Sequence, residues 1–363
     1  YEAFTMYRNT KNVPYYVFGR GSLAQLGDLL KPRREAVDGP VVYFVDHFFR
    51  DHELIGRLPM EKGDQLHFVD SSSEPEVTRI DAFKEAVSAA DSRTPCCVVG
   101  IGGGNALDTA KAVANLLTNP GKAEDYQGWE LVKNPAVYKI GIPTLSGTGS
   151  ECSRTCVLTN IPKNLKLGMN SDYTVYDQLL LDPDLLATVP RDQYFYTGID
   201  TFMHCVESLQ GSYRNAIIDA FSVRAVQLCE EIFLSDDMMS EENREKMMIA
   251  SYIGGMAAGN VGVIHPFSAG LGVVLHVAHG LGNCLALNVL GDIYPKEYKQ
   301  FRTMIERQGV NLPTGICKDL TEEQYEGLYR GCIVHEKPLT NALGPDFKQI
   351  LTRENLIERY KSI

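Results

Sequence analysis

The sequence predicts an α/β domain with a parallel sheet over residues 1–185 and an all-α domain over residues 186–363. Three observations lead to this prediction. Short apolar strand patterns alternate with helical patterns in the first half, the strand patterns fade after about Leu185, and 363 residues exceed one typical domain. The turn-forming segment Asp182-Pro183-Asp184 marks the expected boundary.

The strands expected in the first half are short, apolar and rich in β-branched or aromatic residues. They are Val41–Asp46, Gln65–Asp70, Cys96–Gly102 and Tyr138–Thr144. Between them, apolar residues at helical spacing predict helices over Thr78–Ala90 and Ala106–Leu117. Strands that are apolar on both faces and alternate with helices are typical of a parallel sheet covered on both sides.

The second half carries longer amphipathic patterns that predict helices. They cover Tyr194–Leu209, Ala216–Leu234, Glu241–Ala258 and Pro295–Arg307. One apolar stretch, from Gly272 to Leu290, has nearly the length of a membrane span. It contains His276, His279 and Asn283, which would be costly in a bilayer, so we expect a buried helix or loop instead.

The composition excludes several classes of protein. A net charge of −11 argues against a nucleic-acid or anionic-membrane partner, because like charges repel. An apolar content of 44% excludes a disordered chain. Nine cysteines without CxxC spacing favour reduced thiols and a cytoplasmic protein over a disulfide framework or a zinc ribbon. The first residues show no export-signal pattern.

Two glycine-rich loops follow successive strands. In the first, Gly102, Gly103, Gly104 and Asn105 precede a helix, so backbone amides and the helix N-terminus can cradle a phosphate. A tight turn without a ligand is the alternative. The second loop runs from Thr144 to Glu151 and offers the hydroxyls of Thr144, Ser146 and Thr148. Two such loops at the carboxyl ends of strands predict a Rossmann-like, dinucleotide-binding crevice.

Asp46 ends the strand Val41–Asp46. A carboxylate at that place can bind ribose hydroxyls and would repel a 2′-phosphate, which favours NAD over NADP. An ordinary turn residue is the alternative interpretation.

A metal site is predicted in the second half. Asp200 and His204 are four residues apart and share one helix face, and His265 and His279 follow. One carboxylate and three imidazoles suit Fe(II) or Zn(II). The Asp/His pair alone would also fit a helix surface. We expect the remaining histidines to be solvated: His47, His52, His67 and His335.

Taken together, these motifs resemble the group III, iron-containing alcohol dehydrogenases, whose fold is shared with glycerol dehydrogenase and dehydroquinate synthase. The segments that carry the resemblance are Val17–Leu23, Gly102–Asn105 with Asp108 and Lys111, Pro143–Glu151, Asp182-Pro183, and the Asp200, His204, His265 and His279 set.

The resemblance implies an NAD-dependent alcohol dehydrogenase with one divalent metal, Zn or Fe. It assigns the metal to Asp200, His204, His265 and His279, and the pyrophosphate to Gly102–Asn105. Other cofactor contacts carry over onto Asp46, Asp108, Thr144, Thr148 and Lys166. We also expect a homodimer, in which an N-terminal strand pairs across the two-fold axis.

Within this family the chain is most similar to the branch that oxidises the C8 hydroxyl of 3-deoxy-manno-octulosonate (Kdo). The segments behind this similarity are Asp125–Trp129, His204–Ser208, His279–Cys284, and Leu312-Pro313 with Ile316–Leu320. The similarity implies a bacterial surface-sugar pathway, part of lipopolysaccharide biosynthesis, in which a primary alcohol becomes an aldehyde.

The chain departs from the family pattern at three places. Ala269 stands where many members have a second histidine, Leu145 replaces one threonine of the second loop, and Asn105 replaces a serine. Without a dedicated base, His276 is the candidate proton relay, with a packed or solvent-facing histidine as the alternative. Glu207 is a candidate partner for a ligand imidazole, with an exposed helix residue as the alternative.

The expected reaction is reversible hydride transfer between an alcohol of a sugar or polyol and NAD, with the metal lowering the pKa of the hydroxyl. A generic NAD-dependent small-alcohol dehydrogenase stays open. A lyase of the dehydroquinate synthase type would need several Lys or Arg around an acidic substrate, and residues 186–280 supply few. A metal hydrolase and a non-catalytic sugar-binding protein are further alternatives.

Overall fold

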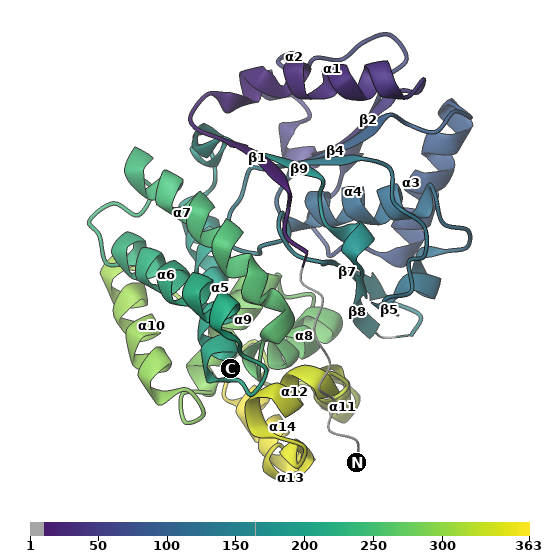
Figure 1. Cartoon of the computed structure of the whole chain (residues 1–363). Coiled ribbons are helices and arrows are strands. Elements are labelled where there is room, and N and C mark those ends of the chain that lie inside the picture. Colours follow the sequence, from purple (N-terminus) through teal and green to yellow (C-terminus); the bar gives the residue numbers. More distant parts are fainter. Residues whose placement is uncertain (1–10, 164) are drawn as a thin grey trace.

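The computed structural model describes residues 11–163 and 165–363. The N-terminal stretch without an export-signal pattern falls largely outside these residues. Six parallel strands form one sheet in the order β1-β9-β6-β4-β2-β3 (Figure 1). They are β1 (Tyr15–Phe18), β2 (Val41–Asp46), β3 (Gln65–Val69), β4 (Cys97–Gly102), β6 (Lys139–Pro143) and β9 (Gln178–Leu181).

Helices cover both faces of this sheet, as the doubly apolar strands predict. Along β2, alternate side chains enter two separate cores: Tyr43 packs with Leu26 of α1, and Phe44 packs with Ile80 of α3. The covering helices are α1 (Leu26–Ala36), α2 (Glu53–Gly56), α3 (Val77–Ala90) and α4 (Gly104–Leu116). The four strands and two helices expected in this half are confirmed within one or two residues at each end.

A second, small sheet lies beside the first and was not predicted. Its order is β5-β8-β7, with β7 and β8 antiparallel. The strands are β5 (Gly128–Trp129), β7 (Thr155–Asn160) and β8 (Leu165–Asn170). Asparagine, glycine and lysine residues, which are uncommon in strands, weaken the strand signal here, and one face of β7 stays partly open to solvent.

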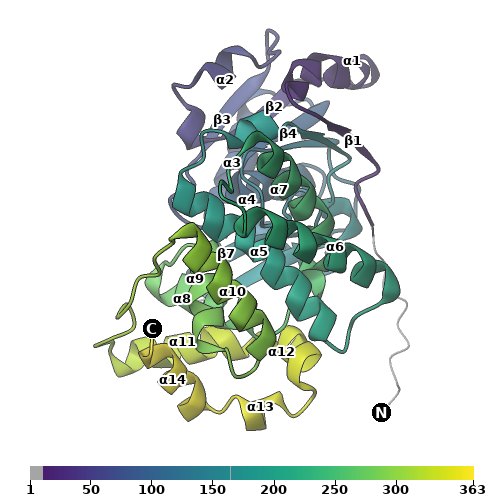
Figure 2. The same ribbon diagram turned by 90° about the vertical axis from the view of Figure 1, so that its left-hand side faces the viewer.

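Helices make up the second half (Figure 2). The longest, α5, packs against α6, α7 and α9. The helices are α5 (Arg191–Gln210), α6 (Ala216–Phe233), α7 (Glu241–Gly254), α8 (Ile264–Leu275), α9 (His279–Val289), α10 (Pro295–Gln308), α11 (Glu322–Ile333), α12 (Glu336–Leu343), α13 (Phe347–Ile350) and α14 (Arg353–Lys361). The expected boundary near Leu185 falls between β9 and α5.

The apolar stretch from Gly272 to Leu290 forms the end of α8 and most of α9. Within the described residues, no single helix is long and apolar enough to cross a membrane. The helical run 241–260 and α8 together reach that length and apolar character, but they meet at 91°. Helix α7 ends four residues before the predicted Ala258. A 3₁₀ helix over Gly255–Asn260 follows it. Gly255 lies close to Gly149, since a Cβ on Gly255 would be 2.5 Å from Gly149 Cα.

The second glycine-rich loop joins the two halves. A Cβ on Gly147 would lie 1.6 Å from the carbonyl oxygen of Thr197 in α5, so a side chain cannot fit. The Gly147 amide donates to Ser251 Oγ at 2.7 Å, and Gly147 O accepts from Thr201 Oγ1 at 3.0 Å. The loop that follows β6 is therefore held directly against α5 and α7.

Gly147→Ala is expected to lower the free energy of unfolding by about 2 kcal/mol more than Gly63→Ala does. Both positions have positive φ, at 143° and 102°, so both substitutions strain the backbone. Only Gly147 also faces a clash, because nothing lies within 4 Å of a Cβ on Gly63. Urea unfolding of the two variants measures the difference, and equal losses would contradict the packing argument.

Candidate functional site

The first glycine-rich loop ends β4 and opens α4. Gly102 has φ of 152°, and its Cβ would lie 2.6 Å from that of Ala106 and 2.9 Å from that of Asp46. Only glycine allows this close approach. Gly103 is the N-cap residue of α4 and has no side chain to cap the helix. The first amides of α4 are thus left for a ligand, and the helix N-terminus favours an anionic one.

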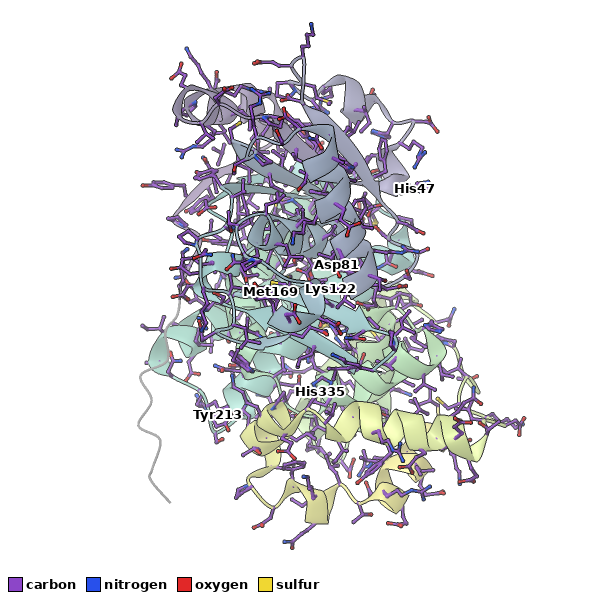
Figure 3. All side chains as sticks on the ribbon, turned by 90° about the vertical axis from the view of Figure 1, so that its right-hand side faces the viewer. His47, Asp81, Lys122, Met169, Tyr213 and His335 are labelled. Atoms are coloured by element: carbon purple, nitrogen blue, oxygen red, sulfur yellow. The ribbon has the colours of Figure 1, made fainter. Side chains whose placement is uncertain are left out.

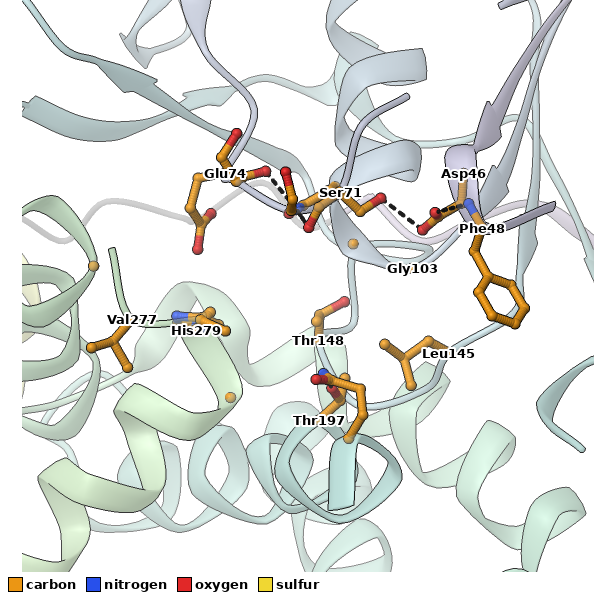
Figure 4. A pocket seen from close by; sticks show the side chains of 18 of the residues that line it. Asp46, Phe48, Ser71, Glu74, Gly103, Leu145, Thr148, Thr197, Val277 and His279 are labelled. Atoms are coloured by element: carbon orange, nitrogen blue, oxygen red, sulfur yellow. Dashed lines mark hydrogen bonds between the residues drawn. The ribbon is translucent and has the colours of Figure 1, made fainter. Parts of the chain in front are cut away.

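A cavity of about 460 Å³ opens between this loop and the helical half (Figure 4). Both halves of the chain contribute to its walls. Residues predicted to contact a cofactor or carry a proton line it together: Asp46, Gly103, Gly104, Asn105, Thr144, Thr148 and His276, along with the predicted metal ligand His279. The crevice predicted from two loops at adjacent strand ends is therefore present as a single space.

Four residues expected to contact the cofactor do not line this cavity: Gly102, Asp108, Ser146 and Lys166. Asp108 is buried, accepts hydrogen bonds from Ser150 Oγ and the amide of Val157, and lies 3.6 Å from Lys111 Nζ. Burial raises its pKa, and Lys111 opposes that rise. Its position supports a role in holding the second loop against α4, rather than a direct contact with a ligand.

A serine-rich turn after β3 also lines the cavity, next to Asp46 and Asn105. It was not predicted from the sequence. Asp46 accepts from Ser71 Oγ at 2.7 Å and from the amide of Phe48 at 3.0 Å, which fixes its carboxylate (Figure 4). Asn105 Nδ2 donates to the carbonyls of Ser71 and Ser73. Asn105, which stands where the family has a serine, thus links the serine turn to the first glycine-rich loop. The signal lay in three serines at the carboxyl end of a predicted strand.

The four predicted metal ligands lie together, and one of them, His279, lines the cavity. Asp200 and His204 come from α5, His265 from α8, and His279 from the first turn of α9. One donor atom from each residue lies within 4.8 Å of the others. The Nε2 atoms of His265, His279 and His204 are 3.1, 3.5 and 3.7 Å from Asp200 carboxylate oxygens.

The donor set fits a divalent metal ion. Asp200 is fully buried, and its Oδ2 has no hydrogen-bond partner among the described residues. Burial opposes ionisation of Asp200, but the surrounding histidines outweigh it and hold its pKa well below the usual value. Burial lowers the pKa of both His204 and His279 to about 4, which leaves them in the neutral form that binds metals.

Glu207 orients His265. Its Oε1 accepts from the amide of Ile264 at 2.6 Å, and its Oε2 lies 2.5 Å from His265 Nδ1. Tyr294 donates to Oε1 at 3.3 Å. Burial opposes protonation of His265, but Glu207 and Asp200 outweigh it and raise its pKa to about 9. With Nδ1 facing a carboxylate, Nε2 is directed at the site, as predicted for a ligand imidazole.

Two further residues belong to this region and were not predicted. Asn283, one turn after His279, donates from Nδ2 to Asp200 Oδ1 at 2.7 Å. His67 and His335 were expected to be solvated, and that expectation is wrong: His67 is half-buried against Phe44, and burial lowers its pKa. His335 is the one near the metal ligands. It is half-buried at the start of α12, where the C-terminal helices meet the rest of the molecule (Figure 3). Burial, with the charges of Lys166 and His265, lowers its pKa to about 4.

His276, the candidate proton relay, lines the same cavity as His279. It is exposed and adopts φ of 55° at the end of α8, three residues before His279. Its role as a proton relay stays a prediction.

Two family models match the chain. "Iron-containing alcohol dehydrogenase" matches residues 14–183, and "Fe-containing alcohol dehydrogenase family, C-terminal" matches residues 194–327. Among curated relatives, sulfoacetaldehyde reductase of Bilophila wadsworthia is 34% identical over 59% of this chain and 56% of its own length. This chain thus matches little more than half of that relative. An NAD-dependent methanol dehydrogenase of Bacillus methanolicus is 29% identical over 74% of this chain and 71% of its own.

Solved structures share the whole fold. Sulfoacetaldehyde reductase from Bifidobacterium kashiwanohense, in complex with NAD⁺, has a TM-score of 0.79 at 24% identity and covers 98% of both chains. An alcohol dehydrogenase from Oenococcus oeni has a TM-score of 0.82 at 21% identity, covering 97% of this chain and 98% of its own. These likenesses support the predicted fold class of a parallel α/β domain followed by a helical one.

Glu207→Gln is expected to weaken metal binding by about 10- to 100-fold. A glutamine can still accept from the Ile264 amide, but its amide group would then donate to His265 Nδ1. In that tautomer Nε2 carries the proton, although Nε2 needs a free lone pair to bind the metal. Elemental analysis and competition with a chelator measure the affinity. Tyr294→Phe, which keeps the carboxylate, is the control. Equal affinity in Glu207→Gln and wild type would contradict this role.

Proposed function

The chain belongs to the iron-containing alcohol dehydrogenase family, and from this premise we propose that it interconverts a small primary alcohol and its aldehyde with NAD(H). One observation carries the proposal. His279 belongs both to the four-residue metal cluster and to the wall of the cavity lined by the two glycine-rich loops. A substrate beside His279 in this cavity would therefore meet the metal site and a cofactor in one space.

Asp200, His204, His265 and His279 would hold the divalent ion, and the donor types suit Fe(II) and Zn(II). When bound, the ion supplies Lewis acidity that lowers the pKa of an alcohol, and NAD supplies the hydride acceptor. Asn283 and Glu207 fix the orientation of Asp200 and His265, so the ligand set is arranged before anything binds.

The protein's own residues bind, orient and exclude water. Gly103 and Gly104 present backbone amides at the start of α4 for the pyrophosphate, and Asp46 is fixed for the ribose. Leu145, Val273 and Val277 give the cavity apolar walls that displace water from the reacting groups. These roles are proposals that rest on position.

The proton released from an alcohol needs a route to solvent. His276 is exposed and lines the cavity, while Ala269 offers no imidazole on the facing turn of α8. We assign the relay to His276, which can pass a proton from the cavity to bulk water.

The substrate differs among the relatives of this chain. The curated relatives named above act on sulfoacetaldehyde and on methanol, so the family does not fix it. Oxidation of Kdo at C8, in surface-sugar biosynthesis, stays a hypothesis that nothing but the sequence similarity supports. A lyase acting on an acidic, phosphate-bearing substrate is disfavoured, because no Lys or Arg is found among the described residues that line the cavity. A homodimer is likewise proposed from resemblance alone.

The direct test is an assay with metal-loaded protein, NADH and a panel of aldehydes, in parallel with NAD, primary alcohols and Kdo. Turnover that requires both the metal and the nicotinamide is expected. His204→Ala should lose bound metal and turnover together, since it removes a ligand. Metal-dependent hydrolysis without NAD, or ligand binding without turnover, would replace this proposal with the hydrolase or the binding protein.

Asp46→Gly is expected to raise the ratio of kcat/KM for NADP to that for NAD by at least about tenfold. The change removes a carboxylate that would repel the 2′-phosphate and also one that binds ribose hydroxyls. Kinetics with both cofactors at one substrate concentration give the ratio. Asp70→Gly, at the exposed end of the neighbouring strand, is the matched control. An unchanged ratio would remove Asp46 from the cofactor site.

A further inference from the structure

An ion pair that the proposed reaction does not use lies beside the metal ligands. Lys166 Nζ in β8 is 2.9 Å from Glu74 Oε1, in the turn between β3 and α3. The Lys166 side chain is 8% exposed and that of Glu74 is 23% exposed. An ammonium group this deeply placed is stabilised only by a nearby carboxylate, so each member of the pair depends on the other.

The pair lies against the wall of the cavity, to which Glu74 belongs. Glu74 lines it on the same side as Val277 and His279 (Figure 4). Lys166 Nζ lies 3.9 Å from the place of a Cβ on Gly272, a cavity residue of α8, the helix that carries His265. Burial opposes ionisation of Glu74, but Lys166 and His279 outweigh it and hold its pKa below the usual value. The pair therefore stands within electrostatic reach of the metal ligands.

The charge around this cavity is otherwise negative or neutral. Among the described residues of its wall, Asp46, Glu74 and Glu76 are acidic, and none is Lys or Arg. Lys166 brings a positive charge close to the reacting end, and Glu74 neutralises it. An anionic substrate would have to displace Glu74 from Lys166 and leave a carboxylate unpaired in a partly buried place, which is unfavourable. An uncharged alcohol or aldehyde meets no such cost.

We propose that Glu74 is a specificity-determining residue, which pairs with Lys166 and thereby selects uncharged alcohols and aldehydes over anionic ones. This inference rests on the proposed function and names its substrate class. It also predicts that two anions are poor substrates for this chain: sulfoacetaldehyde, the substrate named for one relative, and Kdo, which carries a carboxylate.

The experiment compares two aldehydes that differ in one charge. Butyraldehyde and succinic semialdehyde share a carbon chain, and only the second ends in a carboxylate. For each variant, the ratio of kcat/KM for the anionic aldehyde to that for the neutral one is measured with NADH. Because cofactor affinity, metal content and the fraction of folded protein affect both substrates equally, they cancel in this ratio.

Wild type is expected to favour butyraldehyde. In Glu74→Gln the ratio should rise by at least about tenfold, since Lys166 then faces the substrate without a counter-charge. In Glu74→Gln combined with Lys166→Met, the ratio should return to within about twofold of wild type, because the ammonium has gone. Glu76→Gln is the matched control. It removes a cavity carboxylate that forms no ion pair with Lys166 among the described contacts, so a smaller shift is expected.

Sulfoacetaldehyde serves as a second anion, and its kcat/KM should rise in Glu74→Gln along with that of succinic semialdehyde. The inference is overturned if wild type prefers the anions, if Glu74→Gln leaves the ratio unchanged, or if the double variant keeps the raised ratio. A wild-type protein that holds its metal and turns over neither class of aldehyde with NADH would instead remove the proposed function itself.

Discussion

The placement of the second glycine-rich loop against α5 is the constraint on which the site depends. Gly147 meets the backbone of Thr197 with no space for a side chain, and its carbonyl accepts from the hydroxyl of Thr201. Thr201 directly follows Asp200, the carboxylate at the centre of the metal cluster. The loop that carries Thr144 and Thr148 into the cavity is thus fixed to the helix that supplies two metal ligands. Hydride transfer needs donor and acceptor held within contact distance, and a direct backbone contact between the two halves meets that need.

The same contact explains several buried polar groups that would otherwise be costly. Glu151 is buried and accepts from Ser251 Oγ at 2.6 Å, while Ser251 accepts from the Gly147 amide. Burial raises the pKa of Glu151. Lys111, with no exposed surface, donates to the carbonyl oxygens of Ser150, Ser153 and Thr155. These groups hydrogen-bond the loop on both sides, so its irregular backbone is satisfied without being part of a sheet.

The sequence predicted those parts of the structure in which a local pattern reports directly on the environment. Strands β2, β4 and β6 are buried on both faces because helices cover both. Asp200 and His204 share a face because helical spacing requires it. The small sheet was missed because its strands are half-exposed and polar, and their pairing depends on residues distant in sequence. From the sequence, Ser71 was also missed, and Asp108 was assigned a cofactor contact that its position does not support. In both cases the missing information was the direction in which the side chain faces. Which way a loop or helix residue faces is decided by the element packed against it.

The structure shows how charge is distributed around the cavity, which the net charge of the chain does not reveal. A net charge of −11 argues against polyanionic partners, but it says nothing about a small anionic substrate, since the charge of one pocket can differ from that of the whole chain. The cavity wall turns out to be acidic where it carries charge at all, and the nearby ammonium of Lys166 is already paired with Glu74. The ion held by Asp200 and the three histidines would then be the main source of positive charge facing a substrate. Such a charge is localised where the reacting oxygen binds, and it leaves nothing to hold a second anionic group farther along the molecule. Such a site would bind the reacting oxygen of a substrate through the metal. It would offer no cationic side chain to an anionic group at the other end of the substrate, which favours short, uncharged substrates.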